Sequence, residues 1–408
     1  MIVILTSGYP FGGEPFLISE NNYAPKNTIY ISLDPQRERE NDGFLGRAFK
    51  VYSKKNKLKS LKFVLKGFFD KTFWKEMYNI ARKKNFFFKR IFQMICFYGG
   101  SMKCYEEVLA ILKKNNCLNS DTVIYSYWMS YHAFIAATLK KKYPMIKCVT
   151  RCHGYDVYEY RSSTGYLPFR QTIFEEMNII YPISLDGANY IKNMYGSDVF
   201  KKVKVAHLGT EPHGIFLKVQ TENEFFNIVS CSSLISLKRV DKIIMSLSKI
   251  QDKKVRWIHY GDGPLKTKLM MLAEKELSDL GNIKFCFYGQ VDNNTLMEMY
   301  SREYYDLFIN VSSSEGIPVS IMEAMSFGIP TIATDVGGTS EIVNDGFNGF
   351  LLSPNFDVST LASLIERYIG RSVEQQNIYR QHAYNTWNDK FNAKKNYEIF
   401  YKQITNIR

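Results

Sequence analysis

The stretch SSSEGIPVSIMEAMSFGIPTIATDVGGTSEIV, residues 312–343, decides which fold and which site this sequence predicts. An apolar run, DLFINVS at 306–312, leads into it and is typical of a buried strand. Pro318 is well placed as the first residue of a helix, because a missing N–H costs nothing there. Glu315 and Glu323 stand on either side of this helix start, and a second strand and a double glycine follow. Two carboxylates beside a helix start need explaining, since such a start favours anions.

The expected helix start has the properties of an anion site. The N–H groups of Gly316, Ile317 and Val319 precede or open the helix, so the helix itself does not satisfy them. With the helix dipole they favour a phosphate or diphosphate, and Gly316 lets the backbone approach it closely. Because helical side chains lean toward the N-terminus, Glu323 projects toward the same place. A carboxylate accepts hydroxyl groups of a sugar, so these features together predict a nucleotide-sugar.

An isolated glutamate is most often a solvated surface residue. Glu323 differs because its neighbours in the chain are apolar: Ile321, Met322, Ala324 and Met325. Burying a carboxylate costs free energy unless it has a polar partner. The pattern therefore favours a functional role for Glu323.

Outward from this stretch, expected strands and helices alternate in two series. The first series of strands is expected at 2–7, 28–34, 121–128, 146–154 and 178–184, with helices that include 59–83 and 100–115. The second series is expected at 225–233, 255–261, 283–289, 306–312, 331–335 and 349–353. Apolar strands between helices predict parallel sheets covered on both faces. The fold class is therefore α/β, with two domains joined near residue 210 and final helices at 374–408 that exceed what the second domain needs.

The composition is that of a globular protein, with 45% hydrophobic and 23% charged residues among 408. The seven cysteines form no CxxC pair, which favours a reducing compartment and gives no zinc signature. The first residues, MIVILTSGYPFGGEP, lack a basic n-region, so we expect a strand and loop there and not a signal peptide. No apolar run approaches the roughly 20 residues of a transmembrane helix. The expected location is cytoplasmic, with peripheral contact at the inner face of the cell membrane left open.

A basic and aromatic segment at residues 54–90 carries thirteen Lys and Arg against two acidic residues, within a chain of net charge +13. An anionic membrane surface, an acidic acceptor or nucleic acid would all suit such a segment. No nucleic-acid-binding signature accompanies it, and a solvated helical surface remains an equally good interpretation. The candidate acceptor or membrane residues are Lys62, Lys66, Trp74, Arg82, Lys83 and Lys84.

Glu315 and Glu323, with seven residues between them, form the E-x7-E pattern of retaining glycosyltransferase family 4, the group 1 glycosyltransferases. Residues 314–352 resemble that family closely, and GYPFGGEPFLISE, RCHGYD, LGT, SLISLKRVD, HYGDGPL and FYGQV resemble it more loosely. The likeness is greatest to members that build bacterial capsule, exopolysaccharide or lipopolysaccharide. It implies the GT-B fold, in which two Rossmann-like domains face each other across a cleft. The implied domains are an acceptor-binding domain at 1–209, a nucleotide-sugar-binding domain at 210–373 and helices at 374–408 that cross back to the first domain.

The resemblance also implies roles for the donor-binding residues. Glu323 matches the family glutamate that binds ribose, Glu315 the catalytic-site glutamate that binds donor-sugar hydroxyls, and Lys238 the diphosphate-binding lysine. The amides of Gly316, Ile317 and Val319 match those that meet the sugar and diphosphate. Ser233 stands where family members commonly carry an arginine, and Arg239 is a candidate replacement.

Three further segments match the family at the ends of expected strands. His153 matches a catalytic-site histidine near the donor sugar, with Asp156 following it. Gly12 and Gly13 match the glycine-rich loop that approaches the diphosphate and the acceptor. Gly289 to Val291 fall where the family reads the base through backbone atoms.

The implied reaction is glycosyl transfer with retention, from a nucleotide-sugar that we expect to be a UDP-sugar, to a glycan or polyprenyl-linked acceptor. Negative charge grows on the departing diphosphate, and cations and amides stabilise it. No metal or other cofactor is expected, and no Asp-x-Asp occurs in the sequence. Two alternatives stay open: a nucleotide-sugar epimerase or hydrolase on the same fold, and a non-catalytic basic protein that binds membrane or polyanions. No nucleic-acid partner is expected.

Overall fold

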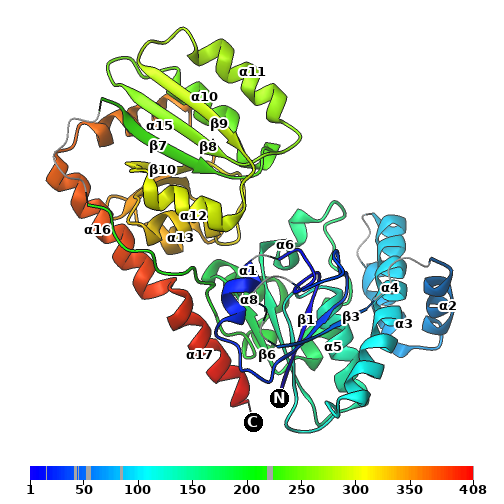
Figure 1. Cartoon of the computed structure of the whole chain (residues 1–408). Coiled ribbons are helices and arrows are strands. Elements are labelled where there is room, and N and C mark those ends of the chain that lie inside the picture. Colours follow the sequence, from blue (N-terminus) through cyan, green and yellow to red (C-terminus); the bar gives the residue numbers. More distant parts are fainter. Residues whose placement is uncertain are drawn as a thin grey trace. The chain divides into compact units, whose positions relative to one another are not determined.

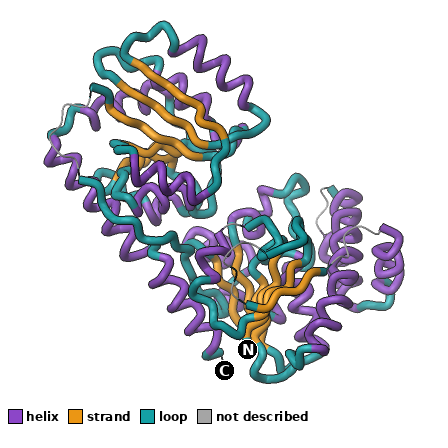
Figure 2. Tube along the Cα trace, in the orientation of Figure 1, coloured by secondary structure: helices purple, strands orange, loops and turns teal. Residues whose placement is uncertain are grey.

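The computed structural model describes residues 1–14, 16–40, 44, 46–51, 57–82, 86–217 and 224–407, and omits the side chains of residues 57–61 (Figures 1 and 2). The chain divides into two compact units. Unit 1 comprises Met1–His207 and Tyr397–Arg408, and unit 2 comprises Leu208–Asn396. Each unit is described by itself.

Unit 1 is built on a six-stranded sheet in the order β3-β2-β1-β4-β5-β6, with every pair of neighbours parallel. Its strands are β1 (Ile2–Thr6), β2 (Ile29–Ser32), β3 (Arg47–Lys50), β4 (Val123–Ser126), β5 (Lys147–Cys152) and β6 (Ile179–Pro182). Its helices are α1 (Phe16–Asn21), α2 (Lys57–Gly67), α3 (Lys71–Arg82), α4 (Phe87–Lys114), α5 (Tyr131–Lys142), α6 (Gly154–Val157), α7 (Arg170–Glu176), α8 (Leu185–Tyr195) and α9 (Ser197–Phe200).

Unit 2 repeats this topology with the order β12-β11-β10-β7-β8-β9, again entirely parallel. Its strands are β7 (Phe226–Cys231), β8 (Val255–Tyr260), β9 (Ile283–Gly289), β10 (Leu307–Asn310), β11 (Thr331–Thr334) and β12 (Gly349–Leu352). Its helices are α10 (Val240–Leu247), α11 (Lys266–Leu277), α12 (Asn293–Arg302), α13 (Val319–Ser326), α14 (Thr339–Ile342), α15 (Val358–Ile369) and α16 (Val373–Lys390), and α17 (Ala393–Thr405) leads from unit 2 into unit 1. Both sheets have the strand order of a Rossmann fold, so the predicted α/β class with two Rossmann-like units is confirmed.

The units meet in sequence at Leu208, and the final helices are shared between them. Residues 374–396 group with unit 2, whereas residues 397–408 group with unit 1. Among the described residues, no helix has both the length and the apolar character needed to cross a membrane. All seven cysteines are free thiols.

The prediction of one continuous helix at 59–83 is wrong, because the structure has two helices there, α2 and α3. Asp70 causes the break: its Oδ1 accepts the Thr72 N–H at 2.8 Å, and its Oδ2 accepts the Tyr98 hydroxyl at 2.9 Å. A short acidic side chain that bonds the backbone two residues on favours a turn over a continuous helix. The helix expected at 100–115 begins earlier, at Phe87, and forms the long α4.

A buried ion pair joins α17 to the sheet of unit 1. Arg151 on β5 and Glu20 on α1 are both fully buried, with Nη2 and Oε2 3.9 Å apart. Tyr125 and Tyr401 donate hydroxyls to Glu20 Oε1 at 3.1 Å and 3.2 Å. The ring of Phe400 lies 4.2 Å from the Arg151 guanidinium carbon. The pair therefore ties the end of the chain to β4, β5 and α1.

Removing one charge of this pair should destabilise unit 1 strongly. Arg151→Met leaves Glu20 buried without its cation, which costs about 3–5 kcal/mol. Calorimetry should show a lower Tm for Arg151→Met and a partial recovery when Glu20→Gln is added. If the decreases in Tm of the two single variants simply add in the double variant, that result would contradict the pairing of Arg151 with Glu20.

Candidate functional site

The candidate site in unit 2 lies where the strand order reverses. β7 and β10 are neighbours in the sheet although they are not consecutive, and ligands of open α/β sheets bind beside such points. Lys238 follows β7 and Glu315 follows β10, and Lys238 Nζ lies 2.5 Å from Glu315 Oε1. The exposed fractions of these side chains are 21% and 13%. Two residues 77 positions apart therefore form a close, partly buried ion pair at this edge.

The helix start next to this pair is α13. Pro318 is its N-cap and Val319 its first residue, one position later than the sequence suggested. Within the described part of the chain, the N–H groups of Gly316, Ile317 and Val319 donate to no backbone carbonyl. These amides are available to a ligand anion, with the dipole of α13 behind them.

The double glycine holds this loop in place by direct backbone contact. Gly338 N–H donates to Gly316 O at 2.7 Å. Gly337 has a φ of +56°, and a Cβ there would lie 2.0 Å from the carbonyl oxygen of Glu315. Only glycine allows both the conformation and the approach.

Glu323 lies on α13 and accepts a hydrogen bond from Asn293 Nδ2 at 2.6 Å. Burial raises the pKa of Glu323 to about 7, and the Asn293 bond acts in the opposite direction. Asn293 opens α12 just after Gly289 and Val291. The segment matched to base recognition is thus connected to the glutamate matched to ribose binding.

Other cations near the strand ends have defined partners. Arg239 donates to the carbonyls of Val311, Ser312 and Pro354, at 2.6, 3.0 and 2.6 Å, so its guanidinium fastens the end of β10. Ser233 is exposed. The role of Arg239 as a replacement for the family arginine stays a prediction.

The sequence analysis missed Lys266, whose ammonium lies beside Gly289 at the end of β9. It pairs with Asp262 at 2.7 Å, four residues earlier in the chain. The sequence signal for this ion pair was the spacing of four residues between Asp262 and Lys266 in GDGPLK.

The candidate residues of unit 1 gather at the ends of β1 and β5. His153 follows β5, and its ring lies 4.3 Å from that of Trp128 and 4.9 Å from that of Tyr127, between ring centroids. Burial and the nearby Arg151 hold the pKa of His153 well below its ordinary value, so the imidazole is neutral. Both ring nitrogens are buried without a hydrogen-bond partner in the described structure. Asp156 accepts the His153 backbone N–H at 2.6 Å and thereby orients this turn.

Gly12 and Gly13 both have positive φ, and Glu14 after them is a residue that the sequence analysis missed. Its carboxylate accepts the N–H groups of Ser7, Gly8 and Tyr9 at 3.1, 2.8 and 2.9 Å, and also the indole N–H of Trp128. Glu14 therefore fixes the glycine loop and the ring that lies against His153. The sequence signal for this role of Glu14 was its position directly after the double glycine.

The described members of the predicted acceptor or membrane residues lie on α2 and α3, which both pack against α4 at one side of unit 1 (Figure 1). Lys62, Lys66, Trp74 and Arg82 are exposed. Lys83 and Lys84 lie outside the described residues. In the described ranges, no group of three or more His, Cys, Asp and Glu side chains gathers as metal ligands would.

Comparison with known proteins agrees with this geometry. Residues 216–386 match the family model of glycosyl transferases group 1. Unit 2 therefore resembles the group 1 glycosyl transferases over most of its length. The predicted family resemblance is thus confirmed for the residues that carry the Glu315 and Glu323 pattern.

Two relatives illustrate the range of similarity. A colanic acid biosynthesis glycosyltransferase by name, WcaL of Salmonella typhimurium, is 26% identical over 262 residues, which are 58% of this chain and 63% of WcaL. A teichuronic acid biosynthesis glycosyltransferase by name, TuaC of Bacillus subtilis, is 29% identical over 177 residues, which are 43% of this chain and 40% of TuaC. The match therefore spans less than two thirds of either relative.

Solved structures share the whole fold. Anabaena HepE, in complex with UDP and glucose, has a TM-score of 0.65 at 16% identity, with 99% of both chains covered. The lipopolysaccharide outer core galactosyltransferase WaaB in its apo form has a TM-score of 0.67 at 16% identity, with 98% of this chain and 99% of WaaB covered. These likenesses establish the fold, which is that of the GT-B class.

The Gly337 contact can be tested with a matched control. Gly337→Ala places a methyl group against the Glu315 carbonyl, whereas Gly346, changed in the control Gly346→Ala, also has a positive φ but open space around it. Placing alanine in a left-handed conformation lowers the free energy of unfolding by about 1–2 kcal/mol. Each kcal/mol lowers the Tm by about 2–4 °C. Calorimetry should show the larger loss for Gly337→Ala. Equal losses would contradict the contact.

The raised pKa of Glu323 predicts a pH-dependent stability. Its carboxyl binds the proton more tightly in the folded chain, so its contribution is present below the ordinary value of 4.5 and is lost as the pH rises to about 7. Glu323→Gln keeps a neutral side chain at every pH. The Tm of Glu323→Gln should equal that of the wild type near pH 4.5 and exceed it at pH 8. A difference that does not change with pH would contradict the burial of this carboxyl.

Proposed function

We propose that the chain is a glycosyltransferase that moves a sugar from a nucleotide-sugar to a glycan or lipid-linked acceptor in the synthesis of a bacterial surface polysaccharide. The observation that carries this proposal is the ion pair of Lys238 and Glu315 in front of the free amides of α13. A cation, free amides and carboxylates side by side fit a donor that carries both a diphosphate and sugar hydroxyls. The names of WcaL and TuaC support the polysaccharide context.

The diphosphate would take the place beside Lys238 and the amides of Gly316, Ile317 and Val319. As the bond between the sugar carbon and the diphosphate oxygen breaks, these groups stabilise the charge that grows on the leaving diphosphate. Glu315, released from Lys238, would accept hydroxyls of the donor sugar, and Glu323 those of the ribose. A UDP-sugar is the donor we propose, which the UDP complex of HepE supports.

Retention of configuration and independence of metal belong to the same proposal. They rest on the E-x7-E pattern and on the lack of Asp-x-Asp in the sequence. The neutral imidazole of His153, with two unpartnered nitrogens, suits a sugar hydroxyl and not a phosphate.

We also propose peripheral contact with an anionic membrane through an aromatic-basic surface on α2, α3 and α4. Three pairs of exposed apolar residues lie four positions apart: Leu65 and Phe69, Trp74 and Tyr78, Phe88 and Phe92. The exposed fractions reach 94% at Phe69 and 84% at Phe88, and an exposed lysine stands between the two members of each pair. Aromatic side chains enter the boundary between headgroups and acyl chains while cations attract anionic lipid.

UDP binding should distinguish the role of Glu323 from that of Glu315. A thermal-shift screen against UDP, GDP, ADP, CMP and their sugars should give a selective rise in Tm with UDP. Glu323→Ala removes hydrogen bonds to a charged group, worth about 1.5–3 kcal/mol, so its UDP affinity should fall about 10- to 100-fold. Glu315→Ala should retain UDP binding and lose turnover. Equal UDP affinity in wild type and Glu323→Ala would remove the ribose assignment.

The same purified protein can be used to test the alternative of a nucleotide-sugar epimerase or hydrolase. Conversion of the nucleotide-sugar without any acceptor would indicate an epimerase or hydrolase. A transferase should release UDP in proportion to glycosylated acceptor.

Membrane contact should depend on the exposed aromatic residues. Co-sedimentation with phosphatidylglycerol vesicles should exceed that with phosphatidylcholine vesicles and should fall at high salt. Phe69→Ser and Phe88→Ser should each weaken it, whereas Met145→Ser, another exposed apolar residue of unit 1, should not. Equal sedimentation of all three variants would argue for a merely solvated surface.

A further inference from the structure

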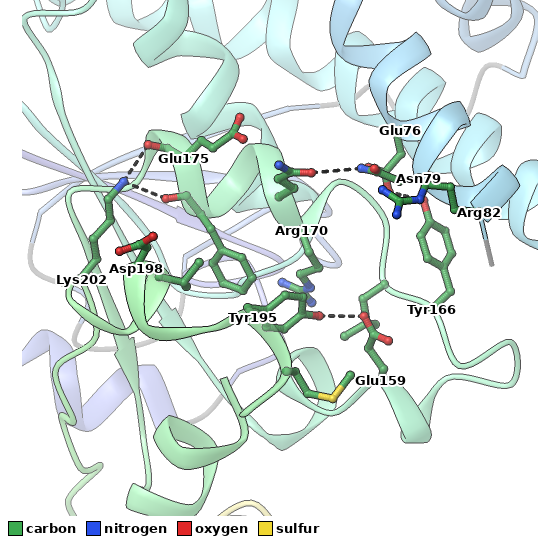
Figure 3. Close-up of a pocket in the computed structure, with 15 residues that line it drawn as sticks. Glu76, Asn79, Arg82, Glu159, Tyr166, Arg170, Glu175, Tyr195, Asp198 and Lys202 are labelled. Carbon is green, nitrogen blue, oxygen red and sulfur yellow. Dashed lines mark hydrogen bonds between the residues drawn. The ribbon is translucent and has the colours of Figure 1, made fainter. Parts of the chain in front are cut away.

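A groove within unit 1 is not used by the site described above. It lies among α3, α7, α8 and α9 and the loop before α7, and has a cavity volume of about 680 Å³ (Figure 3). Ligand pockets of proteins commonly enclose about 300–1,000 Å³. The groove is therefore large enough for an extended small ligand.

The floor of the groove is aromatic. Tyr166 and Phe174 are buried, with exposed fractions of 5% and 3%, and Tyr195 packs edge-on against Phe174 at 4.6 Å between ring centroids. The partly exposed ring of Tyr195 offers an apolar surface against which the C–H faces of a sugar can pack.

The rim of the groove is polar. Asn79 Nδ2 donates to Gln171 Oε1 at 3.3 Å, which joins α3 to α7 by a long and exposed hydrogen bond (Figure 3). The carboxylates of Glu159 and Glu175 are further acceptors along the lining. Amide and carboxylate groups of this kind can exchange partners with hydroxyls.

Arg170 lines the groove as a buried cation with an exposed fraction of 6%. Its terminal nitrogens donate to the carbonyl oxygens of Met129 and Asp156, but its buried Nε has no hydrogen-bond partner in the described structure. A buried donor without an acceptor is costly. The guanidinium is fixed by its two carbonyl partners, so Arg170 contributes a fixed positive charge to the wall of the groove.

The charges exclude two other classes of ligand. The lining carries three cations, Arg82, Arg170 and Lys202, against four carboxylates, Glu76, Glu159, Glu175 and Asp198. This balance gives no net attraction for a polyphosphate. An acyl chain would remove these charged groups from water without compensation.

The groove is connected to the turn that carries His153. Arg170 donates to the carbonyl of Asp156, and the carboxylate of Asp156 accepts the His153 N–H. A ligand that contacts Arg170 in the groove would therefore be connected to the His153 backbone through two hydrogen bonds.

We propose that this groove binds a short stretch of a neutral or weakly charged glycan. Binding of a glycan in the groove does not depend on the proposed function. The identification of this glycan as the acceptor, or as the part of the acceptor beyond the reacting sugar, does rest on the proposed function. All of the lining of the groove belongs to unit 1, whereas the Lys238 and Glu315 pair belongs to unit 2.

The test uses the full chain, without nucleotide, on a printed array of oligosaccharide repeat units from bacterial surface polysaccharides. Titration calorimetry with the strongest binder then compares two variants of adjacent exposed residues on α8. Met194 lines the groove and Asn193 does not. Met194→Trp should fill the groove and weaken glycan binding at least tenfold, and Asn193→Trp should leave it unchanged. Gln171→Ala, a second and smaller change at the rim, should weaken binding while the Tm stays that of the wild type.

Outcomes for the groove and for the proposed function are distinguishable. No bound glycan on the array, equal affinity of Met194→Trp and wild type, or displacement of the glycan by a fluorescent fatty acid would overturn the groove assignment, whatever UDP does. Glycan binding that Met194→Trp abolishes, in a chain that no nucleotide stabilises, would support the groove and reject the proposed transferase. Met194→Trp should keep the UDP-induced rise in Tm.

Discussion

A backbone contact that only glycine permits holds the candidate donor site together. Gly337 and Gly338 press against the carbonyls of Glu315 and Gly316, and one hydrogen bond of 2.7 Å closes the contact. This fixes where the chain leaves β10 and how it enters α13. The contact involves the backbone of Glu315, which pairs with Lys238, and of Gly316, whose N–H is one of the free amides before α13.

The two charged side chains at the start of the candidate donor site are paired with each other. Lys238 and Glu315 neutralise each other, although each suits a different part of a nucleotide-sugar. In unit 1, Glu14 likewise occupies three successive amides that would otherwise attract an anion. A donor that binds as proposed would have to separate Lys238 from Glu315, which costs part of the binding free energy because these charges are only partly exposed.

Much of this arrangement could be predicted from the sequence. The alternation of apolar strands and helices was sufficient for two parallel sheets, and Pro318 with Gly316 was sufficient for a helix start that favours anions. The family pattern then located Glu323 and Lys238. These inferences depend on local spacing, which a single chain displays directly.

What the sequence could not show depends on contacts between distant residues. The break at Asp70 is stabilised by Tyr98, and Asn293 reaches Glu323 across 30 positions. Arg239 donates to three carbonyls, one of them 115 residues away. The role of Glu14 depends on a left-handed conformation and on Trp128, 114 residues further on. The groove beside Arg170 is likewise formed by helices far apart in the chain.

The most direct test of the donor site is a crystal structure of the full chain with UDP bound. We expect the diphosphate at the amides of Gly316, Ile317 and Val319, with Lys238 turned from Glu315 to the phosphate and Glu323 against the ribose. UDP bound elsewhere, or bound with the Lys238 and Glu315 pair intact, would contradict the assignment of this site.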